Sequence, residues 1–168
     1  MTVKITVLKE QDEGGERRVA LIPQVVERLS SLGVSFAMEN GAGAASSYPD
    51  ETYKDVTFST DRKTLLSDAD IVLAVQPPTI ETVQAMKPGA ILVSFIYGRN
   101  HPDLVKALRD QKVTCFAMEL VPRISRAQAM DALSSQATLA GYYAVLPGSV
   151  HMTKFLPMMT TAAGPLRA

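Results

Sequence analysis

The 168-residue sequence has one cysteine, two histidines and no tryptophan. Cys115 lies in the apolar run 113–117, which indicates a small buried core residue rather than a nucleophile. With so few soft or imidazole ligands, and no paired carboxylates at ligand spacing, the sequence predicts no metal site. A single cysteine also fits a reducing cytoplasm.

The chain has no excess of charge of either sign, because 17 Lys and Arg residues balance 17 Asp and Glu residues. Without a basic run it has no electrostatic footprint for nucleic acid or for an anionic membrane surface. Lys4 and Lys9 interrupt the first apolar stretch too early for a signal peptide, and no segment approaches a membrane span. We expect a cytoplasmic protein with no nucleic-acid partner and no direct membrane insertion.

Apolar residues make up 46% of the chain, enough for one ordinary core, and the length predicts one domain over 1–168. Short apolar runs alternate with helical patterns, which predicts an α/β fold with a doubly wound, mostly parallel sheet flanked by helices. The expected strands cover residues 3–8, 34–38, 71–75, 90–96 and 113–117. Pro23 opens one helix that Gly33 closes, and the longest helix is expected from Ser125 to a break at Pro147-Gly148.

Residues 41–46, Gly-Ala-Gly-Ala-Ala-Ser, superficially match a dinucleotide-binding loop. Ser46 replaces its third glycine, and the following Ser-Tyr-Pro-Asp leaves no room for the helix that would hold a pyrophosphate. A structural turn is therefore the prediction here, so this stretch supplies no nucleotide site.

Residues 119–136 place Arg123, Gln128, Asp131 and Ser134 at the junction between a short strand and the long helix. Ligands bind at such junctions in α/β folds. Two structural interpretations stand beside the functional one. Ser125 and Gln128 fit a capping box, and Asp131 fits an acid favoured by the helix dipole.

Six blocks of the sequence, in order, resemble the NAD(H) domain of the alpha subunit of proton-translocating NAD(P) transhydrogenases. They are residues 9–10, 15–23, 39–43, 75–78, 119–136 and 155–164. The resemblance implies that Arg123 holds the carboxamide and ribose of one nicotinamide. It implies that Gln128 and Asp131 bond to the neighbouring ribose or orient Arg123, with Ser134 one turn further on.

The same resemblance implies NAD(H) at the domain face and NADP(H) on a partner component. In that family a Rossmann domain with the glycine fingerprint follows, and we expect it to be absent here, so that the isolated chain is inactive. The expected partners are that NAD-binding domain, the NADP-binding component, the membrane component and a second copy in a homodimer. The location would be cytoplasmic, peripheral to the inner membrane through partner subunits.

An alanine dehydrogenase-type relative is the alternative enzyme, since those proteins use an arginine matching Arg18 to clamp the substrate carboxylate. They also carry a catalytic lysine where this chain has Gln76, and a histidine in the region of residues 95–97. Both groups are absent, which removes the proton chemistry of amino-acid oxidation. A truncated, non-catalytic assembly module, dimerising through the small residues of the long helix, is the third hypothesis.

Overall fold

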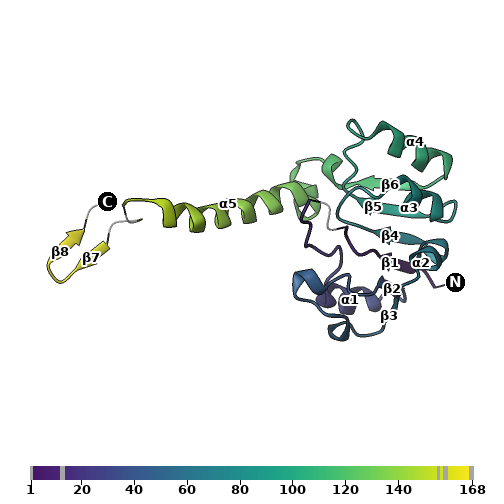
Figure 1. Cartoon of the computed structure of the whole chain (residues 1–168), viewed down its shortest axis with the longest axis horizontal. Coiled ribbons are helices and arrows are strands. Elements are labelled where there is room, and N and C mark those ends of the chain that lie inside the picture. Colours follow the sequence, from purple (N-terminus) through teal and green to yellow (C-terminus); the bar gives the residue numbers. More distant parts are fainter. Residues whose placement is uncertain (1, 12–13, 155, 157–158, 167–168) are drawn as a thin grey trace. The chain divides into compact units, whose positions relative to one another are not determined.

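The computed structural model describes residues 2–11, 14–154, 156 and 159–166. The chain divides into two compact units, Met1–Val121 and Pro122–Ala168. The first unit holds the sheet, and the second holds the long helix and a small hairpin (Figure 1).

The first unit is built on a six-stranded parallel sheet in the order β3-β2-β1-β4-β5-β6. Its strands are β1 Lys4–Val7, β2 Ser35–Glu39, β3 Val56–Ser59, β4 Ile71–Leu73, β5 Ile91–Ser94 and β6 Thr114–Ala117. The helices between them are α1 Pro23–Ser30, α2 Arg62–Asp68, α3 Ile80–Ala85 and α4 Pro102–Asp110. The predicted doubly wound α/β fold is confirmed.

Helices cover both faces of this sheet, and strand residues alternate between two cores. Val72 of β4 packs with side chains of α2, α3 and α4, whereas its neighbours Ile71 and Leu73 face the cluster that contains Val26 of α1. This alternation follows from the two-residue period of a strand. Because both sides are covered, β4 has no polar residue, as expected for a parallel sheet buried in the middle of a fold.

Strand β3 was not predicted, although five of the six strands were. It lies at the edge of the sheet and is only partly buried, so its sequence Val-Thr-Phe-Ser has a weak apolar signal. The loop before it contains two short 3-10 turns, Ala44–Ser46 and Asp50–Thr52. No α-helix follows Gly41 before β3, which confirms the prediction of a structural turn at residues 41–46.

The second unit contains a 3-10 segment at Ser125–Met130, then α5 at Ala132–His151 and an antiparallel hairpin of β7 Met159–Thr161 and β8 Gly164–Leu166. The prediction that the long helix starts near Ser125 is wrong. Asp131 has φ −76° and ψ 83°, which is not helical, so α5 begins one residue later. Within the described ranges, no helix is long and apolar enough to cross a membrane.

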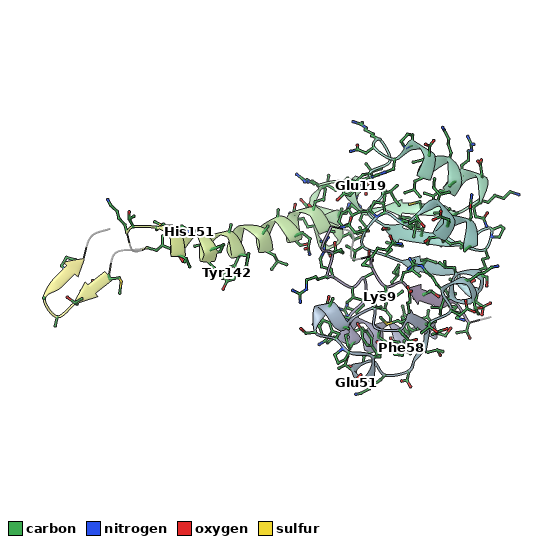
Figure 2. The ribbon with its side chains drawn as sticks, in the orientation of Figure 1. Lys9, Glu51, Phe58, Glu119, Tyr142 and His151 are labelled. Atoms are coloured by element: carbon green, nitrogen blue, oxygen red, sulfur yellow. The ribbon has the colours of Figure 1, made fainter. Side chains whose placement is uncertain are left out.

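The predicted break at Pro147-Gly148 is also wrong, because α5 continues through both residues to His151. A proline inside a helix removes one backbone hydrogen bond and crowds the carbonyl four residues earlier, but the turns on either side can keep their own bonds. The side chains of α5 from Ser134 onward are exposed, and Tyr142, labelled in Figure 2, is 74% exposed.

Candidate functional site

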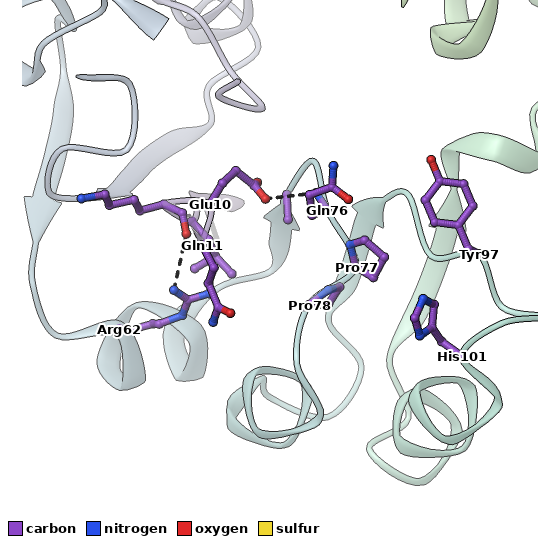
Figure 3. Close-up of a pocket in the computed structure, with 11 residues that line it drawn as sticks. Glu10, Gln11, Arg62, Gln76, Pro77, Pro78, Tyr97 and His101 are labelled. Atoms are coloured by element: carbon purple, nitrogen blue, oxygen red, sulfur yellow. Dashed lines mark hydrogen bonds between the residues drawn. The ribbon is translucent and has the colours of Figure 1, made fainter. Parts of the chain in front are cut away.

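A crevice opens at the carboxyl edge of the sheet, between the ends of β1 and β4. The chain proceeds from β1 toward β3 on one side and from β4 toward β6 on the other, so this is the point where the strand order reverses. Ligands of doubly wound folds bind at such a point. The cavity there has about 280 Å³ and is lined by Leu8, Lys9, Glu10, Gln11, Arg62, Ala74, Gln76, Pro77, Pro78, Tyr97 and His101 (Figure 3).

Glu10 joins the two strand ends at the centre of this crevice. Its carboxylate accepts hydrogen bonds from the backbone N–H groups of Val75, at 2.6 Å, and Gln76, at 3.0 Å. Burial raises the pKa of the Glu10 carboxyl, while the two backbone bonds oppose that rise. Glu10 therefore fixes the segment after β4 that carries Gln76 into the cavity.

Glu16 forms a second carboxylate centre beside Glu10. One oxygen accepts from Arg18 N at 2.9 Å and Nε at 2.8 Å, and the other from Arg18 Nη2 and Gln76 Nε2, both at 2.6 Å. The hydrogen bond from Arg18 is the main cause that lowers the pKa of Glu16 to about 2. Arg18, at this carboxyl edge as predicted, lines a neighbouring cavity of about 210 Å³ with Glu16.

Tyr97 and His101 lie on the far side of the crevice from Arg62 (Figure 3). Tyr97 has a left-handed backbone with φ 47°, which is uncommon for an aromatic residue, and its ring stacks on Phe95 at 5.8 Å. The Glu119 carboxylate holds this turn by accepting from Ile96 N at 3.0 Å and Tyr97 N at 2.7 Å. His101 is the N-cap residue of α4, in keeping with its position before Pro102.

The four residues singled out in the second unit lie on its 3-10 segment and on the start of α5. Asp131 and Ser134 are in direct contact: Ser134 N donates to Asp131 Oδ1 at 2.9 Å, and Ser134 Oγ donates to Oδ2 at 2.5 Å. These bonds from Ser134 are the main cause that lowers the pKa of Asp131, and the charge of Arg123 contributes. The side chains of Arg123 and Gln128 are exposed.

The structure decides between the capping interpretations. The 3-10 segment starts after Ile124 with no side-chain cap, so Ser125 and Gln128 do not form the predicted capping box. Asp131 is instead the N-cap of α5, which confirms that it stabilises a helix start. The Gln128 side chain is exposed, and its backbone carbonyl accepts from Asp131 N at 3.2 Å.

Residues 6–140 match the family model described as alanine dehydrogenase/PNT, N-terminal domain. The chain belongs to this family. Its relatives in the family include an NAD(P) transhydrogenase alpha subunit of Rhodospirillum rubrum, which is 43% identical over 96% of this chain and 44% of that protein. Alanine dehydrogenase of Bacillus subtilis is 31% identical over 84% of this chain and 37% of that protein.

Among solved structures, the transhydrogenase from Sinorhizobium meliloti matches this family member with a TM-score of 0.84 and 39% identity. The match covers 98% of this chain and 49% of that one. The chain therefore spans under half the length of these relatives. The resemblance to transhydrogenase alpha subunits is confirmed.

The sequence reasoning missed the carboxylates that organise the crevice of this family member. Glu10 follows β1 and Glu119 follows β6, each within three residues of the strand end, and each binds two backbone N–H groups after the neighbouring strand. An acidic residue just after a strand was the available signal. Across the described ranges, no group of three or more His, Cys, Asp or Glu side chains could hold a metal ion.

Proposed function

We propose that this chain contributes the nicotinamide-positioning part of an NAD(P) transhydrogenase. The complete enzyme would transfer hydride from NADH to NADP and couple the transfer to proton translocation. The observation that carries the proposal is the family match across residues 6–140, which includes the whole segment from Arg123 to Ser134. The greater identity to transhydrogenase subunits than to alanine dehydrogenase, 43% against 31%, supports this choice within the family.

The residues of this segment suit a positioning role. Hydride donation and acceptance are supplied by the two nicotinamide cofactors, so the protein must orient them and exclude water. Arg123 would bind the carboxamide and ribose side of NAD(H). Gln128, whose exposed amide caps no helix, would bond to the neighbouring ribose. Asp131, already held by two bonds from Ser134, would orient Arg123 through their opposite charges.

The crevice of the first unit agrees with a reaction that needs no proton transfer. Gln76 and Tyr97 stand there, and neither is an efficient acid or base near neutral pH. An alanine dehydrogenase-type activity would need such a group. Alanine-dependent reduction of NAD, assayed on the assembled enzyme, should therefore be absent, and its presence would favour the alternative.

We further propose that the adenosine and pyrophosphate of NAD(H) are bound by a separate Rossmann domain, while NADP(H) binds to a partner component. A membrane component and a second copy of the chain would complete the assembly on the cytoplasmic side of the inner membrane. The loop at residues 41–46 supports a separate pyrophosphate site, since it leads into 3-10 turns and offers no α-helix N-terminus. Titration of the chain with NADH, followed by nicotinamide fluorescence, should show no saturable binding at micromolar concentration.

Variants in the assembled transhydrogenase test the positioning role. Arg123→Lys keeps the charge but loses the bidentate fork, and Gln128→Asn withdraws the amide by one methylene. Misplacement by about 1 Å can cost on the order of 100-fold in rate, so single-turnover hydride transfer should fall steeply with little change in NADH affinity. Arg126→Lys, on the same exposed 3-10 segment, is the matched control.

Thermal unfolding of the same proteins separates function from structure. Gln128→Asn should leave the unfolding temperature unchanged, because the Gln128 side chain caps no helix. Normal hydride transfer in both Arg123→Lys and Gln128→Asn would contradict the proposed role of this segment.

A further inference from the structure

The Glu16 carboxylate has the surroundings of a bound ligand. Four hydrogen bonds converge on its two oxygens, three from Arg18 and one from Gln76. A carboxylate has about four lone-pair positions, and an arginine fork fits it bidentately. The side chain of Glu16 is only 8% exposed, whereas an ordinary surface ion pair such as Glu27 with Lys54 is 58% and 78% exposed.

The position of Glu16 is also that of a ligand, at the carboxyl edge of the sheet. It lines the 210 Å³ cavity, and its partner Gln76 lines the 280 Å³ crevice where the strand order reverses. Lys9 and Glu10 line both cavities, so the two spaces adjoin. Space for a small molecule therefore lies next to donors that already hold a carboxylate.

We propose that Arg18 and Gln76 form a carboxylate-binding site whose built-in occupant is Glu16, and that Glu16 excludes free small carboxylates from the crevice. The exclusion follows from proximity. A group attached to the same chain is presented at an effective concentration of the order of millimolar or more, so a free carboxylate at similar concentration competes poorly. Glu16 is thus a specificity-determining residue, and this role does not depend on hydride transfer.

Removal of the Glu16 carboxylate should open the site. Glu16→Ala leaves the Arg18 charge and the Gln76 amide without this partner and adds volume to the 210 Å³ cavity. Propionate is the suitable probe because it reproduces the end of a glutamate side chain. Its neutral analogue propionamide has the same shape but lacks the charge that pairs with a guanidinium.

The experiment is a calorimetric titration of the whole chain with propionate. Glu16→Ala should bind with a Kd on the order of 1 mM, and wild type should bind at least about tenfold more weakly. Glu27→Ala changes the net charge equally at an exposed ion pair and should behave as wild type. Propionamide should bind to none of them, and Glu16→Ala with Arg18→Met should lose the propionate site.

A second measurement covers poor folding of the alanine variant. Glu16→Gln keeps the size of the side chain and removes its charge, so propionate should raise the thermal unfolding temperature of this variant but not of wild type. Equal propionate binding by wild type and Glu16→Ala would overturn the proposal, since Glu16 would then exclude nothing. Absence of binding to both folded Glu16 variants would overturn it too, and would show that the cluster is only a structural ion pair.

Discussion

The Glu16 cluster should make the stability of the first unit depend on pH in a defined direction. The pKa of Glu16 falls from 4.5 to about 2 in the folded chain. A lowered folded-state pKa means that the ionised carboxylate stabilises the fold above pH 4.5 and that this stabilisation is lost as the pH falls toward about 2. The Glu16→Gln substitution removes the ionised group and therefore the pH-dependent part of the stability.

The size of the effect follows from the shift and its surroundings. At 1.36 kcal/mol per pH unit, a fall from 4.5 to about 2 corresponds to roughly 3 kcal/mol. Arg18 is 44% exposed, so water screens the pair, and we expect about 1 to 2 kcal/mol at pH 7. At pH 3 the difference between wild type and Glu16→Gln should be less than half as large.

Urea unfolding at pH 7 and pH 3, with each protein monitored by circular dichroism, measures this difference. Glu27→Gln is the matched control, and its exposed ion pair with Lys54 should contribute under about 1 kcal/mol at either pH. A difference between wild type and Glu16→Gln that is the same at both pH values would refute the reasoning. The stabilisation would then come from shape or hydrogen bonding that does not need the charge.

Three further predictions concern the core, the loop before β3 and the cysteine. Leu92→Ala, at a fully buried site on β5, should lower the free energy of unfolding by about 2 to 5 kcal/mol in urea, whereas exposed Leu32→Ala should change it little. Gly43→Ala should cost about 1 to 3 kcal/mol in the same assay, because the new methyl group would overlap the Tyr48 carbonyl oxygen and the Tyr53 hydroxyl. Burial raises the pKa of Cys115 from 9.0 to about 11, so its thiolate is about 100-fold scarcer at pH 8 and alkylation by iodoacetamide should accelerate sharply on unfolding.

Much of the sheet could be predicted from the sequence, because buried parallel strands are apolar on both faces. Residues 71–75 contain no polar residue before Gln76, and the structure places β4 within them. The edge strand β3 gave no such signal, since Thr57 and Ser59 alternate with Val56 and Phe58 beside charged neighbours. Half-buried strands of four residues are too short for periodicity to identify them with certainty.

The candidate site was only partly predictable, for a different physical reason. The segment from Arg123 to Ser134 was found through its residue pattern, but its backbone was predicted as continuous helix. One residue, Asp131, leaves the helical region, and side-chain hydrogen bonds from Ser134 hold it there. The crevice was harder still, since Glu10, Gln76 and Glu119 are brought together by the strand order and are up to 109 residues apart in the sequence.

The N-cap at Asp131 restricts how this position can evolve. A side chain there must accept a hydrogen bond from Ser134 N, which only Asp, Asn, Ser and Thr do well. Among these four residues, aspartate alone brings a negative charge. A lineage that abandoned the reaction could therefore drift to Asn, Ser or Thr and keep α5 intact, whereas drift to other residues would weaken the helix start. The residue found here in any homologue thus separates loss of charge from loss of fold.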